Sequence, residues 1–527
     1  MGKAKKIASR KSPSKVSKPA KAIIRQLPTG VRGLDEILGG GLPEFSFNII
    51  AGAPGCGKTT LAHQIIFANA TPENPALYFT VLGEPPLKML RYQQQYSFFD
   101  TAKLNKAIRF INLTDVVLDK DLGGVLDAIA KEVKASNPSM VVVDSFRSVA
   151  RSGLRGADVM ELQGFVQHLA LLLTSWQATT FLIGEYSDGE MRDNPIFTVA
   201  DGLLWLTQVT ERNSVVRKLQ IMKLRGQESV PGLHTVRIDN GGLQAFSRTL
   251  GLVGGKNRPD KMKRLSTGIA ELDKMMGGGI LEGDSVLVAG PSGTGKSALA
   301  TQFLAEGLRH GDPGIAAIFE ERPDGYVERA KGFGLDLETP QKTGKLELLY
   351  LRPLDLSVDE TMQAILDAVT RLKAKRLVID SLVGFEMALA PGFRVDFRES
   401  LYRMIAALTQ AGVTILTTVE IEDSFTSFEF SHYSISFLTD DIIRLRYVEI
   451  DGQVRKVIVI VKMRGGNHSK DIREYVIGDH GLDVIKPLDK DYLQQLTTGI
   501  PDRIGQGLRR ALSKTSPEPK ARSKAKR

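Results

Sequence analysis

The chain is poor in cysteine and has no long hydrophobic run. Cys56 is the single cysteine among 527 residues, so the chain cannot form an internal disulfide. This fits a reducing cytoplasm, which is the location we expect. No apolar run reaches the roughly 18 residues that a membrane-spanning helix needs. The Lys- and Ser-rich N-terminus also lacks the apolar block of a secretory signal, and we therefore expect no membrane partner.

Acidic residues are scarce at both ends of the chain. Residues 1–26 hold nine lysines and arginines and no acid, and residues 503–527 hold nine with Glu518 as the single acid. The segment between these ends is net acidic, although the whole chain has a formal charge of +10. Basic ends rich in Ser and Pro are typical of disordered tails. Docking on nucleic acid or another acidic partner is the alternative, which the lack of aromatic residues for base stacking disfavours.

The chain consists of two similar halves. Residues 29–41, TGVRGLDEILGGG, align without a gap on residues 267–279, TGIAELDKMMGGG, at an offset of 238. After a small slip, VVVDS at 141–145 corresponds to LVIDS at 377–381. A period this long indicates duplication of a whole domain, because solenoid repeats have periods of only about 20–50 residues.

Each half alternates short apolar runs with amphipathic helical patterns. In the first half, FNIIAG at 47–52 reads as a buried strand, and 60–70 and 159–176 read as helices. This alternation predicts an α/β fold in which each half has a central, mostly parallel sheet. The predicted organisation is a basic tail at 1–26, a first domain at 27–248, a linker at 249–265, a second domain at 266–487, and a C-terminal loop with a basic tail at 488–527.

Each half carries the spacing G-x-x-x-x-G-K-[ST] directly after a predicted strand, as GAPGCGKT at 52–59 and GPSGTGKS at 290–297. In such a P-loop, glycines let backbone N–H groups close around phosphate oxygens at a helix N-terminus. Lys58 and Lys296 are expected to reach the β- and γ-phosphates. We interpret Cys56 as a small packed loop residue; the less favoured alternative is a thiol whose oxidation blocks the nucleotide. The expected nucleotide-binding residues are Gly52, Gly55, Gly57, Lys58, Thr59, Thr60, Gly290, Gly293, Thr294, Gly295, Lys296 and Ser297.

Two hydroxyl and two carboxylate residues are candidates for binding Mg²⁺. Thr59 and Ser297 follow the P-loop lysines, where a hydroxyl ligates the metal. Asp144 and Asp380 each end an apolar strand, where a carboxylate holds the water shell of the metal. A turn or helix cap is the ordinary role of a single Asp after a strand. Because each aspartate accompanies a P-loop, we favour the metal role and expect ATP and Mg²⁺ as cofactors.

Hydrolysis also needs a group that activates the nucleophile. In the second half Glu320 and Glu321 directly follow the apolar run IAAIF. In the first half the equivalent run is followed by Leu82, Gly83 and Glu84, so one of the two carboxylates is missing. The candidate bases are therefore Glu84, Glu320 and Glu321, although a solvated loop would also explain a pair of glutamates. We expect slow hydrolysis and a mainly structural ATP in the first half, because loss of a general base costs about 10²–10⁴-fold.

Together these features resemble the KaiC family of duplicated RecA-like ATPases. The resemblance covers about residues 27–505. It rests on the TG…LD…GGG lead-in before each P-loop, the two P-loops, the glutamate pair, the K-x-R-G end of each half, and SH…TDDIIRLRYVEI at 431–450. It implies two tandem RecA-like domains and a two-tier homo-hexamer with ATP between neighbouring subunits.

The resemblance also assigns roles to four basic residues. It implies that Lys223, Arg225, Lys462 and Arg464 reach the ATP that an adjacent protomer holds. A positive group supplied in trans stabilises charge on the transferred phosphoryl group and makes hydrolysis depend on assembly. The alternative is exposed charge at the end of a strand.

The second domain of the family is also an autokinase that phosphorylates two adjacent hydroxyl residues across the subunit interface. Counting back from Thr439 puts these positions at Ser436 and Phe437. Ser436 has a hydroxyl to accept the phosphoryl group and Phe437 has none, which argues against a two-site phosphorylation cycle. Ser434 and Ser431 are alternatives if the local alignment shifts.

On this resemblance the chain is expected to be an ATP-hydrolysing, self-phosphorylating hexamer that serves as a signalling or timing switch. Glu320 is the best candidate base for the acceptor hydroxyl, with Glu321 beside it. Residues 497–505, TTGIPDRIG, are similar to the family's C-terminal loop, which recruits the activator KaiA, so Kai-type regulatory partners are implied. The alternatives are an ATPase without kinase activity, a RecA-like DNA-binding motor, and a nucleotide-dependent assembly scaffold.

Overall fold

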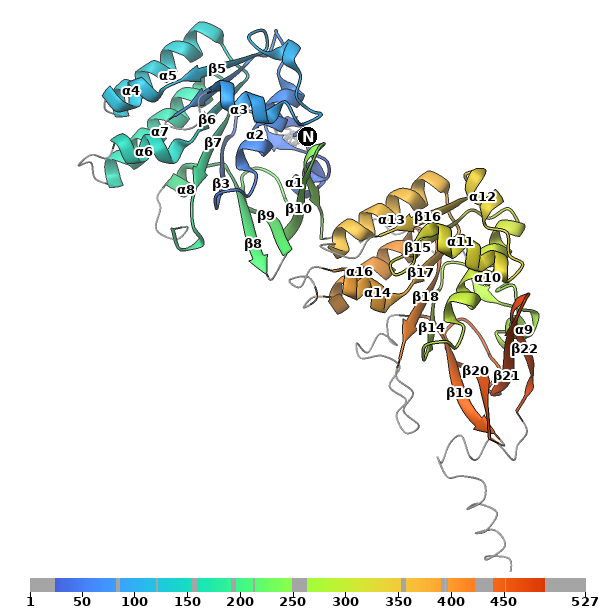
Figure 1. Cartoon of the computed structure of the whole chain (residues 1–527). Coiled ribbons are helices and arrows are strands. Elements are labelled where there is room, and N and C mark those ends of the chain that lie inside the picture. The colour runs from blue at the N-terminus through green and yellow to red at the C-terminus, as the bar shows by residue number, and fades with distance from the viewer. Residues whose placement is uncertain are drawn as a thin grey trace, which may run out of the picture. The chain divides into compact units, whose positions relative to one another are not determined.

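The computed structural model describes residues 24–81, 86–119, 122–153, 159–190, 196–211, 214–248, 263–351, 357–389, 394, 397–421, 439–450 and 452–488. These residues form two α/β halves, each built on a nine-stranded sheet with helices packed against it (Figure 1). Within these described ranges, no helix combines the length and the apolar character needed to cross a membrane.

The first sheet has the P-loop strand at its centre. From edge to edge its strands are β5 (Ile108–Asn112), β4 (Ala76–Thr80), β6 (Met140–Asp144), β7 (Thr179–Glu185), β3 (Phe47–Gly52), β8 (Gly202–Glu211), β9 (Ser214–Leu224), β10 (Leu233–Asp239) and β11 (Gly242–Phe246). The strands from β5 to β3 are parallel, whereas β9 and β10 pair antiparallel. A separate antiparallel pair joins β1 (Gln26–Leu27) to β2 (Leu42–Pro43).

The helices of the first half connect these strands. They are α1 (Leu34–Leu38), α2 (Lys58–Asn69), α3 (Pro86–Gln93), α4 (Thr114–Asp119), α5 (Leu122–Ser136), α6 (Phe146–Gly153), α7 (Val159–Ser175) and α8 (Ile196–Val199), with short 3₁₀ turns at Thr101–Lys103 and Asp188–Glu190. The helices predicted at 60–70 and 159–176 are thereby confirmed as α2 and α7.

The second sheet repeats the order of the first. Its strands are β16 (Leu346–Tyr350), β15 (Gly314–Ile318), β17 (Arg376–Asp380), β18 (Thr414–Glu420), β14 (Ser285–Gly290), β19 (Asp441–Ile450), β20 (Gln453–Met463), β21 (Arg473–Gly478) and β22 (Gly481–Pro487). The strands from β16 to β19 are parallel, and β19 to β22 pair antiparallel.

The second half also begins with a short antiparallel pair, β12 (Arg264–Leu265) and β13 (Ile280–Leu281). The last two residues of the expected linker therefore belong to a strand. The helices of this half are α9 (Ala270–Met275), α10 (Lys296–Arg309), α11 (Pro323–Gly332), α12 (Glu338–Lys342), α13 (Val358–Leu372), α14 (Leu382–Ala388) and α16 (Phe397–Gln410).

The central strands are buried on both faces. In β14, Val286 and Val288 pack in a core with side chains of α10, whereas Leu287 and Ala289 pack in a second core with α13 and α16. This alternation follows from the two-residue period of a strand with helices on both sides. The predicted α/β fold with mostly parallel sheets is confirmed. The antiparallel strands on one side of each sheet were not part of the prediction.

Candidate functional site

Both P-loops connect the carboxyl end of the central strand to a helix. The first follows β3 and enters α2 at Lys58, and the second follows β14 and enters α10 at Lys296. The residues that precede these helices, Gly57 (φ 103°) and Gly295 (φ 93°), have left-handed backbone, and no side chain caps either helix. The amides of the first helical turn are therefore available to phosphate oxygens.

The second loop also needs glycine for packing. A Cβ added at Gly290 would lie 2.6 Å from the carbonyl oxygen of Leu445, and one at Gly295 would lie 2.4 Å from Cδ1 of Ile477. Neighbouring strands therefore press directly against the loop.

The two P-loop lysines adopt the same position. Nζ of Lys58 donates to the carbonyl oxygen of Ala53 at 2.8 Å, and Nζ of Lys296 donates to that of Pro291 at 2.8 Å. Burial lowers the pKa of Lys296. Each ammonium group lies against its own loop, where a bound phosphate would offer it an anionic partner.

Asp144 and Asp380 lie at the carboxyl edge of their sheets, as predicted. In the first half, Oγ1 of Thr59 donates to Oδ2 of Asp144 at 2.8 Å. Burial raises the pKa of Asp144, and hydrogen bonds from Tyr78 and Thr59 offset only part of this rise. In the second half, Oγ1 of Thr418 donates to Oδ1 of Asp380 at 2.6 Å.

These residues fit Mg²⁺ held jointly with a nucleotide. Within the described ranges, no group of three or more His, Cys, Asp or Glu side chains is placed to hold a metal ion alone. Mg²⁺ is typically bound by one or two protein oxygens together with substrate phosphates and water. A P-loop hydroxyl with a nearby carboxylate supplies such protein oxygens in the first half.

Four of the predicted site residues of the second half lie around one cavity. Its volume is about 370 Å³, and its lining residues are Ser297, Ile318, Glu320, Glu321, Tyr326, Arg329 and Asp380. The structure thus brings together both predicted metal ligands and both predicted glutamates. The spacing of the motifs gave no indication of Tyr326 or Arg329, because both lie on α11, outside every recognised motif.

The two glutamates differ in their partners. Oε1 of Glu320 accepts a hydrogen bond from Oγ of Ser381 at 2.6 Å. Oε2 of Glu321 is paired with Nη2 of Arg329 at 2.8 Å, and that guanidinium lies 4.8 Å above the ring of Tyr326. Arg329 therefore compensates the charge of Glu321, whereas Glu320 is exposed and bonded to a neutral hydroxyl.

The strand register shows which first-half residues correspond to the glutamate pair. β4 and β15 end at the same level, each with its last residue paired to the aspartate of the next strand. Counting two residues on puts Leu82 at the sequence position of Glu320 and Gly83 at that of Glu321. Glu84 is one residue further along. Leu82, Gly83 and Glu84 lie outside the described residues.

The K-x-R motif of the second half lies level with the amino end of the central strand β14, whereas its own P-loop follows the carboxyl end of that strand. Lys462 lies at the end of β20 and Arg464 directly follows this strand, where its backbone N–H donates to the carbonyl oxygen of Asp440. Asp440 in turn bonds to Ser285, the first residue of β14, whereas the P-loop follows the last residue, Gly290. At 3.3 Å per residue this strand separates the two sites by about 17 Å.

The first half has the same arrangement. Arg225 forms an ion pair with Asp201 at 3.2 Å, and the backbone N–H of Asp201 donates to Phe47 at the start of β3. Nζ of Lys223 donates to the carbonyl oxygen of Thr198 at 3.0 Å, and burial, followed by the charge of Arg225, lowers the lysine pKa. Neither basic motif points toward the P-loop of its own half.

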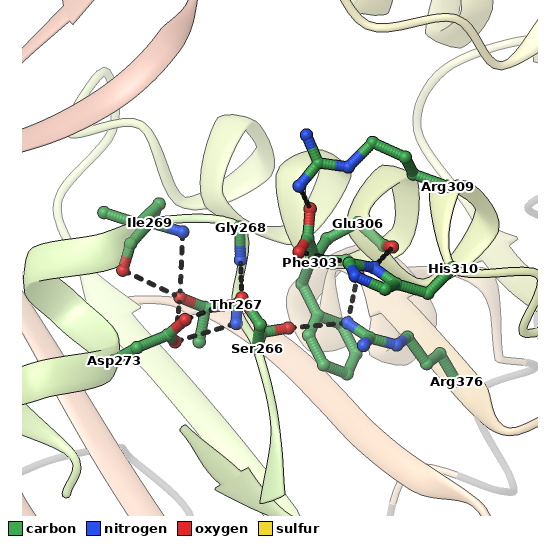
Figure 2. A network of polar contacts seen from close by, with 10 residues as sticks. All are labelled: Ser266, Thr267, Gly268, Ile269, Asp273, Phe303, Glu306, Arg309, His310 and Arg376. Carbon is green, nitrogen blue, oxygen red and sulfur yellow. Dashed lines mark hydrogen bonds and ion pairs between the residues drawn. The ribbon is translucent and has the colours of Figure 1, made fainter. Parts of the chain in front are cut away.

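The threonine and aspartate of the lead-in form a clasp. The backbone N–H and Oγ1 of Thr267 donate to Oδ1 of Asp273 at 2.8 and 2.7 Å (Figure 2). Thr29 makes the same two contacts to Asp35, also at 2.8 and 2.7 Å. Both side chains of the clasp are used within the lead-in, which explains the recurrence of these residues by structure rather than catalysis.

The glycine triplet of the lead-in packs against the K-x-R-G turn. A Cβ at Gly39 would lie 2.5 Å from the carbonyl oxygen of Glu228. Nε2 of Gln227 donates to the carbonyl oxygens of Leu38 and Gly41 at 2.7 and 2.6 Å. The lead-in and the basic motif are therefore one local unit, although about 190 residues of sequence separate them.

The remaining predicted P-loop residues lie in the loops or the first helical turn. Cys56 is buried, Nζ of Lys58 lies 3.8 Å from its sulfur, and burial raises the pKa of the thiol. A raised pKa makes the thiol less reactive, which supports its interpretation as a packing residue. Oγ1 of Thr294 donates to the carbonyl oxygen of Pro291 at 2.7 Å, within the loop.

Several predicted residues lie outside the part of the chain that the structure describes. These are the phospho-acceptor candidate Ser436, its neighbours Phe437, Ser434 and Ser431, the C-terminal loop at 497–505, and the basic ends at 1–23 and 503–527. The tail predicted at 1–26 ends too late, because Gln26 belongs to strand β1.

Comparisons with known proteins agree with this duplicated site. A family model described as "ATPase: KaiC" matches residues 27–249 and again residues 265–489. The circadian clock oscillator protein KaiC of Picosynechococcus sp. (strain PCC 7002) is 29% identical over 503 residues, which cover 93% of this chain and 95% of that protein.

Two further relatives carry the same name. The protein from Rippkaea orientalis is 30% identical over 493 residues, 91% of this chain and 92% of its own length. The protein from Thermosynechococcus vestitus is 28% identical over 505 residues, 93% of this chain and 94% of its own length. With both halves matched and the strand order repeated, this chain of two tandem RecA-like domains belongs to the KaiC family of ATPases.

Proposed function

We propose that this protein binds ATP with Mg²⁺ in both halves, hydrolyses ATP, and phosphorylates itself on a serine of the second half. The observation that supports this most directly is the cavity beside the second P-loop. It places Ser297, Asp380, Glu320 and Glu321 around a single space. These are the residue types that phosphoryl transfer requires, because its catalysis consists mainly of positioning and charge stabilisation.

In this proposal each residue of the second site has one task. The loop amides and Lys296 would bind phosphate oxygens, and Ser297 and Asp380 would hold Mg²⁺, which would supply positive charge to offset that of the phosphates. Glu320 takes the proton from the attacking hydroxyl. As the hydroxyl oxygen bonds to the γ-phosphorus, the bond from that phosphorus to the oxygen of the β-phosphate breaks, and ADP leaves. Glu321 is less suited to this task, because Arg329 already pairs with its carboxylate.

The first site is proposed to hold ATP mainly as a structural ligand. It has a P-loop and the Thr59–Asp144 pair. At the sequence positions of the glutamate pair it has Leu82 and Gly83. Without a base of this kind, we expect hydrolysis there to be slower by about 10²–10⁴-fold.

We propose that the protein works as a homo-hexamer. Lys223, Arg225, Lys462 and Arg464 lie at the sheet edge opposite their own P-loops, so they are suited to a nucleotide held by a neighbouring copy. Three relatives named above are circadian clock oscillator proteins. By analogy we propose a timing or signalling switch with Kai-type regulatory partners, placed in the cytoplasm, where the single unpaired thiol of Cys56 stays reduced.

ATPase activity without kinase activity is the second candidate function. It is favoured by Phe437, which stands where the resemblance calls for the second phospho-acceptor and has no hydroxyl. In that case water replaces the serine hydroxyl as nucleophile, and Glu320 keeps the same task.

Incubation with ATP labelled at the γ-phosphate tests the proposal and separates the two candidates. We expect label to be retained on the full-length protein and to be lost in Ser436→Ala. Glu320→Gln should lower both retained label and free phosphate by about 10²–10⁴-fold, whereas Glu321→Gln, which changes the neighbouring carboxylate, should have a smaller effect.

Free phosphate without retained label would establish the ATPase alone. Equal losses in the two Gln variants would contradict the assignment of Glu320 as the base. The rates of ATP hydrolysis by Lys58→Ala and by Lys296→Ala, compared in samples with the same particle mass, show which half of the chain hydrolyses ATP. We expect most of it to disappear in Lys296→Ala.

A further inference from the structure

Two hydroxyl groups donate to the same oxygen of Asp144. Besides Oγ1 of Thr59, the phenol oxygen of Tyr78 donates to Oδ2 of Asp144 at 2.7 Å. Tyr78 lies on β4, the strand next to Asp144 on β6, and its side chain is fully buried. A buried carboxylate is costly unless hydrogen bonds compensate its charge. Tyr78 supplies such a bond from outside the P-loop.

In the second half, the equivalent aspartate, Asp380, receives its hydrogen bond from the strand on its other side. The strand position of Tyr78 is occupied there by Ala316, which has no hydroxyl. Asp380 accepts instead from Thr418 on β18, at 2.6 Å. In the first half the residue beside Asp144 on that side is Ile183 of β7. Each aspartate thus keeps a hydroxyl donor from a flanking strand, although the two halves use opposite neighbours.

Tyr78 is held firmly in this position. Its ring stacks on His63 with 4.6 Å between centroids and an interplanar angle of 6°. His63 lies on α2, one turn after Thr59, and burial lowers its pKa to about 3, so its ring stays neutral. The tyrosine of the second site, Tyr326, makes its hydroxyl contact with Thr301 at 3.2 Å.

We propose that Tyr78 is a positioning residue for Mg²⁺ in the first half: its phenol holds the Asp144 carboxylate with Oδ2 toward Thr59 and leaves Oδ1 for the hydration shell of the metal. This rests on the proposed ATP–Mg²⁺ site. Removing the phenol hydroxyl leaves the carboxylate less well oriented and its ionised form less stabilised. Tyr78→Phe should therefore raise the Mg²⁺ concentration that half-saturates nucleotide binding by about tenfold, the lower end for loss of a hydrogen bond to a charged group.

The test measures binding of a fluorescent ATP analogue to the full-length protein as free Mg²⁺ is varied. All samples carry Lys296→Ala to remove binding at the second P-loop. We expect Tyr78→Phe to shift the Mg²⁺ midpoint while metal-free nucleotide affinity stays within about twofold. Tyr186→Phe is the matched control, since it also removes the hydroxyl of a buried tyrosine of the first half, but one whose ring packs against Phe197 and Arg147. Its midpoint should not move.

A second variant tests whether the effect of Tyr78→Phe comes from the lost hydrogen bond to Asp144 rather than from a general disturbance of the fold. Ile183→Thr, added to Tyr78→Phe, offers Asp144 a hydroxyl from β7, as Thr418 offers one to Asp380. We expect it to restore the midpoint. An unchanged midpoint in Tyr78→Phe, an equal loss of metal-free binding, or no rescue by Ile183→Thr would overturn the role of Tyr78. If the parent protein binds the nucleotide with no Mg²⁺ dependence, the ATP–Mg²⁺ site itself is wrong.

Discussion

Asp441 is a buried carboxylate at the start of β19. Its side chain is fully buried, and neither oxygen accepts a hydrogen bond of ordinary geometry from the described residues. Burial and the nearby charges of Asp284 and Asp440 raise its pKa to about 7, and the backbone N–H of Arg464 and the charge of Arg264 offset only part of this rise. In the folded protein this group therefore exchanges its proton near neutral pH.

The stability of the second half should consequently fall as pH rises from about 4 to 7. In that window the folded state keeps the proton of Asp441, whereas the unfolded chain, with a pKa of about 3.9, has lost it. The lost stability amounts to at most about 4 kcal/mol. Asp441→Asn removes this titration, so we expect it to be more stable than the parent at pH 8 and similar at pH 4.5. Urea unfolding at both pH values measures the difference, and an equal effect at the two would contradict the assignment.

At the residue scale, spacing alone located the groups that lie on or beside the P-loops. Lys58, Thr59 and Asp144 were predicted because each has a fixed place relative to a strand end. Tyr78 and Thr418 were missed, since a tyrosine or threonine in an apolar strand reveals no role until the strand order is known. Their contact with an aspartate depends on which strand lies beside it, and that order is a property of the whole sheet.

At the element scale, both halves tie the lead-in to the P-loop helix, but with different residues. In the first half, Nδ2 of Asn69 donates to the carbonyl oxygens of Pro28 and Ile65 at 2.8 and 2.9 Å. In the second half, Nη1 of Arg376 donates to the equivalent carbonyl oxygens of Ser266 and Phe303 at 2.8 and 2.7 Å (Figure 2).

The two linking side chains cannot be present in one half together, because they would collide. Gly307 stands at the position of Asn69, at the same offset of 238. A Cβ there would lie 2.4 Å from Cδ of Arg376. Arg376 comes from β17 and replaces Met140, the first residue of the equivalent strand β6. The link between elements is therefore retained while its residues have changed.

This equivalence predicts a rescue. Arg376→Met removes both hydrogen bonds and should destabilise the second half by about 2 kcal/mol, because hydrogen bonds from a charged group contribute about 1.5–3 kcal/mol. Gly307→Asn alone should also destabilise, because it collides with Arg376. The double variant re-creates the bridge of the first half and should recover much of the loss. Denaturant unfolding of the three variants gives the coupling energy. Additive losses in the double variant would show that the two bridges are not equivalent.

The limits of prediction at this scale are also physical. The parallel strands and their helices were predictable, because burial on both faces gives continuous apolar runs. The antiparallel strands β8–β11 and β19–β22 were not, since half-buried strands mix polar and apolar residues and resemble other segments. Those strands carry the K-x-R motifs to the far edge of each sheet.

At the scale of the whole molecule, the placement of the two basic motifs leads to a prediction about assembly. Arg464 belongs to the sheet edge level with Ser285, and the P-loop that its half carries begins after Gly290. A side chain cannot span the about 17 Å between them. If Arg464 acts on a nucleotide, that nucleotide is held by another copy, and contacts of this head-to-tail kind form a ring when the rotation between copies closes.

Mixing two inactive variants tests this directly. Lys296→Ala disables the second P-loop but keeps Arg464, and Arg464→Ala keeps the P-loop but lacks the arginine. In rings assembled from equal amounts of both, a site is complete when the P-loop of one protein meets the arginine of the other. Random order makes this true for about one quarter of the sites, so we expect about a quarter of the parent turnover from a mixture of proteins that are each inactive alone.

The control is a mixture of each variant with the double variant Lys296→Ala/Arg464→Ala. It assembles in the same way but contributes neither group. Because the double variant supplies no arginine to an intact P-loop and no P-loop to an intact arginine, these mixtures should stay inactive. If Arg464 served the P-loop of its own chain, the first mixture would stay inactive as well. Recovery confined to the complementary pair would therefore establish that each second-half site is completed by a neighbouring copy.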